Sequence, residues 1–126
     1  MALMTEKAPQ IQVLFGDEFK RRLKSLQKRY RRIRVDLQPL IDQIQAGENP
    51  GDQVAGTGYT VFKVRVKNSD NRKGKSGGYR VIYQMSSSIC TILLLIYSKS
   101  DQDNVEIEEI QTAIAQFQLD SEQPDS

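Results

Sequence analysis

The sequence predicts an α+β domain, in which a mostly antiparallel sheet carries an N-terminal two-helix hairpin on one face and a C-terminal helix, in the order βααβββα. Two apolar runs, at residues 79–85 and 89–97, are separated by three serines and predict a β-hairpin. Residues 59–67 (YTVFKVRVK) alternate between apolar and polar positions, which indicates a third strand. Three other segments repeat apolar residues at helical spacing.

A length of 126 residues is typical of one compact domain with a single core. Residues 1–10 are short and polar and contain Pro9, so we expect a flexible leader. The domain then covers residues 11–119, and residues 120–126 are expected to be a disordered acidic tail. No secretory pattern opens the chain and no stretch is long enough to span a bilayer, so we expect a cytoplasmic protein without membrane contact.

The first part of the domain is predicted to hold one strand and two helices. Residues 11–15 (IQVLF) form the strand, and Asp17 is a suitable N-cap for the first helix. The apolar stripe of that helix is Phe19, Leu23, Leu26 and Tyr30. Because Pro39 is tolerated only in a first turn, we expect the second helix to begin near residues 35–36, and Gly47 is suited to end it.

The second part begins with a Gly- and Pro-rich loop at residues 48–58. In the strand that follows, one face holds three apolar residues and the other displays Lys63, Arg65 and Lys67. Residues 92–96 are apolar without interruption, so this strand should be the most buried of the sheet. A helix is predicted at about residues 105–117. The helical hairpin then covers one face of the sheet and leaves the other partly open.

Composition limits the chemistry that the chain can perform. It contains no histidine, which removes the commonest general base and metal ligand, and we expect no metal site and no cofactor. The single cysteine, Cys90, lies in a predicted buried strand, so we expect it to be a core residue. Any catalysis must therefore use Lys, Arg, Tyr or carboxylates.

The charge is divided unequally along the chain. Residues 1–99 hold all 18 Lys and Arg and 8 of the 16 acids, a net charge of +10, whereas residues 100–126 hold the other 8 acids and no base, a net charge of −8. A body this basic attracts polyanions, so RNA, DNA or an acidic protein segment are the candidate partners.

The hairpin also brings polar residues together at one edge. Arg80 enters its first strand, and Tyr97 and Lys99 leave its second. Since the start of one antiparallel strand lies beside the end of the next, Arg80 should meet Tyr97 and Lys99. We assign alternate residues of the first strand, Tyr79 among them, to the core side.

Four segments, GKSGGYRVIY, ILLLIYSKSD, FKRRLKSL and FKVRVK, make the chain resemble the RelE/ParE superfamily of bacterial type II toxins, and particularly the RelE-like mRNA interferases. The resemblance runs from residue 11 to about residue 117. It implies a toxin that is held inactive by a cognate antitoxin, enters the ribosomal A site and cuts the translated mRNA. The implied reaction is metal-independent attack of a ribose 2′-hydroxyl on the adjacent phosphate, which leaves a cyclic phosphate and a 5′-hydroxyl.

The resemblance also implies roles for residues of this chain. Lys63, Arg65 and Arg80 match catalytic or phosphate-binding cations of RelE-like toxins. Lys63 is the candidate base, because neighbouring cations disfavour the charged form of a lysine. Arg65 and Arg80 would hold the phosphate, and Tyr97 or Lys99 would supply the leaving-group proton. The residues expected to bind RNA are Lys67, Arg72, Lys73 and Lys75.

One place departs from the family pattern. RelE proper carries an arginine just after the lysine of its last strand and a tyrosine beyond it, where this chain has Ser100 and the acidic DQDNVE. Cleavage would then rely on Tyr97 and Lys99, as in relatives that end in YSK, or be weak.

Two other functions are compatible with the sequence. One is a ParE-like toxin that inhibits gyrase without nuclease activity, and the other is a non-catalytic basic module that binds nucleic acid. If the chain is a toxin of either kind, we expect it to form a hetero-oligomer with an antitoxin. The antitoxin would dock over the helical hairpin at residues 20–34 or over the open sheet face. The acidic C-terminal part is a candidate screen for the basic face.

Overall fold

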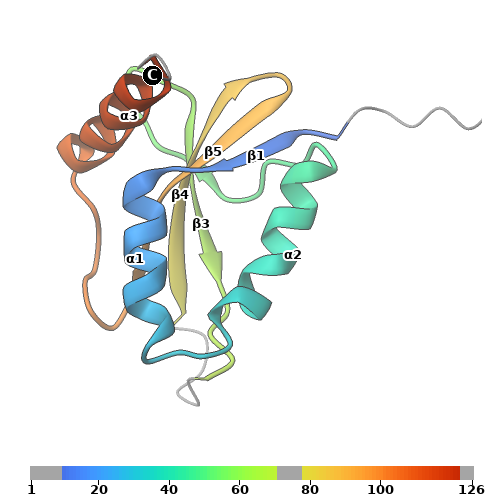
Figure 1. Ribbon diagram of the computed structural model, residues 1–126, viewed down its shortest axis with the longest axis vertical. Helices are drawn as coiled ribbons and strands as arrows, with labels where there is room; N and C mark the ends of the chain where they lie inside the picture. The colour runs from blue at the N-terminus through green and yellow to red at the C-terminus, as the bar shows by residue number, and fades with distance from the viewer. Residues whose placement is uncertain (1–9, 71–77, 123–126) are drawn as a thin grey trace, which may run out of the picture.

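The computed structural model describes residues 10–70 and 78–122, and its core is a five-stranded sheet in the order β1-β5-β4-β3-β2 (Figure 1). β1 pairs with β5 in parallel, and the other pairs are antiparallel. The predicted α+β fold is thus confirmed. The elements are β1 (Gln12–Phe15), α1 (Asp17–Gln27), α2 (Ile33–Gln45), β2 (Asp52–Gln53), β3 (Val61–Val66), β4 (Tyr79–Ser87), β5 (Cys90–Ser98) and α3 (Ile107–Glu122).

Helices cover both faces of the sheet. On one face, α1 and α2 run in opposite directions and bury their apolar stripes against β3, β4 and β5 (Figure 1). On the other face, Ile110, Ala113 and Ile114 of α3 pack on a second apolar cluster that includes Ile82 and Leu95. The face predicted to be partly open is therefore covered by α3 where it is apolar.

The uninterrupted apolar run in β5 has a structural explanation. Ile82 pairs with Leu95, but the next residue, Tyr83, pairs with Leu93, so Leu94 is an extra residue in a β-bulge. The bulge lets two consecutive residues, Leu94 and Leu95, join the cluster beneath α3. All residues from 91 to 98 are buried, which confirms that β5 is the most buried strand of the sheet.

Both helices of the hairpin begin earlier than predicted. Asp17 is the first residue of α1 and not its N-cap, a position that Gly16 occupies. The backbone N–H of Gly16 donates to the Leu93 carbonyl at 2.9 Å, so pairing with β5 fixes the residue where the helix starts. A tertiary contact overrides the capping preference of an aspartate.

The helix α2 begins at Ile33, earlier than predicted, and contains Pro39 in its interior. Ile33 is fully buried, and Asp36 N–H donates to the Arg32 carbonyl, so the first turn is already formed before the proline. Proline costs one backbone bond there, which the buried apolar stripe of α2 offsets. At the other end Gly47 has φ of 94° and forms a Schellman motif, as the sequence predicted.

One strand was not predicted, and one helix is longer than predicted. The two-residue strand β2 lies within the predicted loop 48–58, where Gly51 has φ of 98° and fits closely against the backbone of β3. The helix α3 runs to Glu122, five residues beyond the predicted end. The leader residues 1–9, the loop residues 71–77 and the tail residues 123–126 lie outside the described residues. In the described part, no helix is long and apolar enough to cross a membrane.

The two glycines with positive φ in the α2–β2 connection provide a test of the close contact with β3. A Cβ on Gly51 would lie 2.3 Å from the Lys63 carbonyl oxygen, whereas a Cβ on Gly47 meets no atom within 4 Å. We expect Gly47→Ala to lower the free energy of unfolding by about 1–2 kcal/mol through backbone strain. Gly51→Ala should cost more, because β3 must also move. Urea denaturation of both variants measures the difference, and equal losses would contradict the contact.

Candidate active site

Three polar residues form one row across the middle strands of the sheet. Arg65 of β3 pairs with Arg80 of β4, and Arg80 pairs with Tyr97 of β5. Directly opposed residues share a face and have Cα atoms about 4.5–5.5 Å apart. The row lies on the α3 face, because the neighbouring Val64 and Val81 point to the α1–α2 core. The prediction that Arg80 meets Tyr97 is confirmed, whereas Lys99 lies beyond the paired residues, with its backbone N–H bonded to the Gly78 carbonyl.

Arg80 is a buried cation. Its residue is 8% exposed, and its Nη1 donates to the Tyr79 carbonyl at 3.2 Å. Among the described residues, no carboxylate lies within salt-bridge distance of its guanidinium. Burial and then the Arg65 charge lower the pKa of Arg80, while Tyr97 acts in the opposite direction. This group therefore has unused capacity to bind an anion.

Tyr97 is a buried acid at the end of the row. The residue is 3% exposed, and in the described structure its hydroxyl has no hydrogen-bond partner. Burial raises the pKa of Tyr97, Arg80 opposes that rise, and the acidic Glu109 and Asp103 add to it. Tyr97 is consequently a neutral proton donor at physiological pH.

The segment after β5 accepts hydrogen bonds from two lysines. Lys63 lies on the same face of β3 as Arg65, and its Nζ donates to Oδ1 of Asn104 at 3.3 Å. Lys99 donates to the backbone carbonyl of Asp103 at 3.0 Å. Consecutive residues thus hold amines that are 36 positions apart in the sequence.

Sequence reasoning missed three polar residues that contact or pair with Lys63 or Lys99. Asn104 and Asp103 lie in a segment whose composition indicated only acidity. Asp52 is directly opposite Lys63 in the β2–β3 pair, but β2 has two residues in a Gly- and Pro-rich stretch, so no periodic pattern marks it. Of the predicted RNA-binding residues, Lys67 is exposed just after β3, and Arg72, Lys73 and Lys75 lie outside the described residues.

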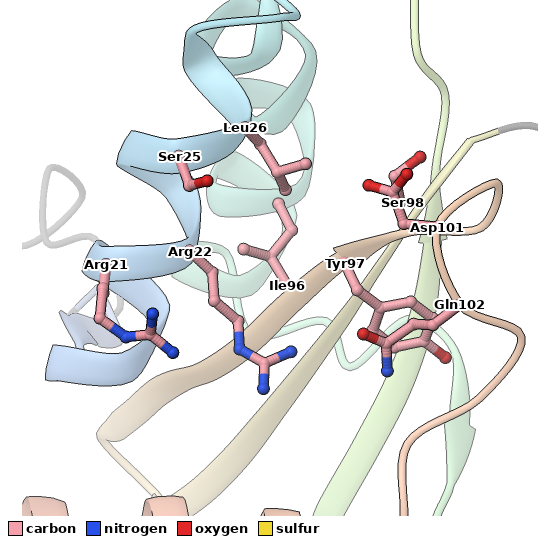
Figure 2. Close-up of a pocket in the computed structure, with 9 residues that line it drawn as sticks. All are labelled: Arg21, Arg22, Ser25, Leu26, Ile96, Tyr97, Ser98, Asp101 and Gln102. Atoms are coloured by element: carbon pink, nitrogen blue, oxygen red, sulfur yellow. The ribbon is translucent and has the colours of Figure 1, made fainter.

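A pocket of about 270 Å³ opens between α1 and the end of β5, on the other side of Tyr97 (Figure 2). The guanidinium groups of Arg21 and Arg22 line its α1 side, and Tyr97 and Gln102 lie opposite (Figure 2). Both arginines are paired with Glu18, and Arg22 also contacts Glu109 at 3.3 Å. These cations are neutralised, in contrast to Arg80. The remaining lining residues are Ser25, Leu26, Ile96, Ser98 and Asp101.

A family model described as the RelE toxin of the RelE/RelB toxin-antitoxin system matches residues 19–122. The chain belongs to the RelE toxin family. The comparison with curated proteins finds no match. The match includes every residue of the row and both lysines, and a RelE/RelB system implies a cognate antitoxin as partner of this toxin.

The structure also shows the conformation of Ser100 and the acidic segment after it, where the sequence of this RelE toxin departs from the family pattern. Ser100 and Asp101 follow β5 in a turn, where Asp101 N–H donates to the Ser98 carbonyl at 2.9 Å. Asp101 pairs with Arg29 at the end of α1. The acids of this segment therefore bind Arg29 and Lys99. The guanidinium groups of Arg65 and Arg80 are left without a carboxylate partner in the described residues.

The burial of Arg80 predicts an unusual effect on stability. Arg80→Met keeps an unbranched apolar side chain and removes the buried charge, so we expect the free energy of unfolding to rise by about 1 kcal/mol. Arg65→Met, at an exposed position, should change it by less than about 0.5 kcal/mol. Urea denaturation checks both values. A loss of stability in Arg80→Met would mean that the bond to the Tyr79 carbonyl outweighs the cost of burying the charge.

Proposed function

We propose that this RelE toxin is a ribosome-dependent endoribonuclease that cuts mRNA by attack of a ribose 2′-hydroxyl on the adjacent phosphate, with side chains as the only catalytic groups. The observation that carries the proposal is the row of Arg65, Arg80 and Tyr97, in which a buried cation without a carboxylate partner lies next to a buried neutral phenol. This arrangement suits a reaction that develops negative charge on a phosphate and needs a proton donor.

The proposed reaction forms one bond to phosphorus, breaks another and transfers two protons. Lys63 takes the proton of the 2′-hydroxyl while the 2′-oxygen forms a bond to phosphorus. The bond between phosphorus and the 5′-oxygen breaks, and that oxygen receives a proton. The products are a 2′,3′-cyclic phosphate and a 5′-hydroxyl.

Arg65 and Arg80 stabilise the charge that develops on the phosphorane oxygens. Arg80 is the stronger candidate because its guanidinium is already desolvated, and a buried ionic contact gains more than an exposed one. Arg65, at the β3 end of the row, is exposed to solvent and can therefore contact the substrate first. Its charge also lowers the pKa of Arg80, so a bound phosphate would relieve the repulsion between the two cations.

Tyr97 is the candidate acid for the leaving 5′-oxygen. Its raised pKa keeps the hydroxyl protonated, and the hydroxyl has no competing partner among the described residues. Lys99 is the alternative donor, but its ammonium is held by the Asp103 carbonyl. Lys67 and the loop residues Arg72, Lys73 and Lys75 would bind the flanking RNA.

The antitoxin would form a hetero-oligomer with the toxin by covering basic surface. The outer side of α1 and the turn to α2 expose a set of cations without a carboxylate partner in the described residues, namely Lys20, Lys24, Lys28, Arg31, Arg32 and Arg34. An acidic segment of the antitoxin suits this surface, as it also suits the sheet face that carries the row.

A translation reaction with purified ribosomes and a defined mRNA tests the nuclease. Wild-type toxin should produce new mRNA ends that carry a 5′-hydroxyl and a cyclic phosphate, seen by primer extension and end-group analysis. Arg80→Met should reduce the cleavage rate about 100- to 1,000-fold, because it removes charge stabilisation in the transition state. Tyr97→Phe should reduce it at least about 100-fold.

Lys24→Met is the matched control, because it removes an exposed cation of α1 that lies outside the row. Its cleavage rate should stay within about twofold of wild type. Intact mRNA combined with inhibited gyrase would overturn the proposal in favour of a ParE-like toxin. Intact mRNA with RNA retention that depends only on total charge would identify a non-catalytic basic module.

A further inference from the structure

The segment between β5 and α3 is fixed in place by several contacts. Asp101 pairs with Arg29 in the turn after α1, and the Gln102 side-chain amide donates to the Asn104 carbonyl at 2.8 Å. The backbone N–H of Glu106 is capped by the Glu109 carboxylate at 3.2 Å, and Glu109 also contacts Arg22. These contacts connect the segment to α1 and to the first turn of α3, so its side chains have defined positions relative to the sheet.

Asn104 points its side chain from this fixed segment toward β3. Its Oδ1 accepts a hydrogen bond from Lys63 Nζ at 3.3 Å. Lysine has four rotatable side-chain bonds, and an unrestrained amine would spend most of its time away from any one reacting atom. The contact restricts Lys63 to the side of β3 where Arg65, Arg80 and Tyr97 form their row.

We propose that Asn104 is a positioning residue, whose amide oxygen holds the Lys63 amine beside the row of Arg65, Arg80 and Tyr97. The inference rests on the proposed function, in which Lys63 is the base. It gives a role to the segment DQDNVE, which this chain has where RelE proper carries a tyrosine. Asn104 acts through Lys63 and does not touch the reacting atoms.

The neutral amide suits this role better than a carboxylate. Of the charged groups on the neighbouring elements, Asp52 of β2 pairs directly with Lys63, and Arg65 of β3 pairs with Arg80 of β4 two positions along. The segment after β5 adds Lys99 and Asp103, which contact each other. A carboxylate in place of the Asn104 amide would favour the ammonium form of Lys63, which cannot accept a proton. An amide restrains the side chain without adding a negative charge.

The pH dependence of cleavage separates positioning from a purely structural role. Asn104→Asp has nearly the same shape, so we expect the segment to keep its place while the rising limb of the rate profile moves about one pH unit higher. Asn104→Ala removes the restraint and should lower kcat about 10- to 100-fold with KM within about twofold. Gln12→Glu makes the same chemical change on β1, at the opposite edge of the sheet, and should leave the profile unchanged.

A second measurement works without RNA and without activity. Side-chain NMR of lysine-labelled protein, with the Lys63 signal assigned through Lys63→Arg, should show that signal moving in Asn104→Asp and titrating at higher pH than in wild type. If the signal moves while wild-type toxin leaves mRNA intact, the contact stands and the nuclease proposal fails. If the Lys63 signal and the rate profile of Asn104→Asp both match wild type, Asn104 does not position Lys63.

Discussion

The continuous pairing of β3, β4 and β5 is the constraint on which the site depends. Each strand contributes one polar residue to the α3 face at the same level, so backbone hydrogen bonds bring Arg65, Arg80 and Tyr97 together. A slip of one residue in any pair would send one of them into the core beneath α1 and α2. The apolar residues on both faces prevent that slip, because they would then be exposed to the polar surroundings of the site.

The sequence was sufficient to predict most of the fold, because each strand and helix carries a clear periodicity. The pairing of Arg80 with Tyr97 followed from hairpin geometry alone. The errors arose where a tertiary contact outweighed a local preference: Gly16 begins α1 because it binds Leu93, and α2 includes Pro39 because Ile33 is buried. Asn104 could not be predicted, since a hydrogen bond between residues 41 positions apart leaves no local pattern.

The site combines groups that are unfavourable for stability. A guanidinium without a carboxylate partner and a hydroxyl without a hydrogen bond both cost free energy when they are buried, and the two lie side by side. The large apolar clusters on either side of the sheet compensate for this cost. A phosphate would supply the missing partner of the cation, so the features that destabilise the free protein are those that favour its proposed substrate.

The parallel pairing of β1 with β5 has a consequence for biosynthesis. β1 leaves the ribosome before β5, the strand that it pairs with, which follows more than 70 residues later. Such distant contacts fold slowly, and at about 5–20 residues per second the N-terminal helices wait several seconds for the strand that covers them. Since Tyr97 lies on that same strand, an intact site cannot exist before the ribosome has made β5.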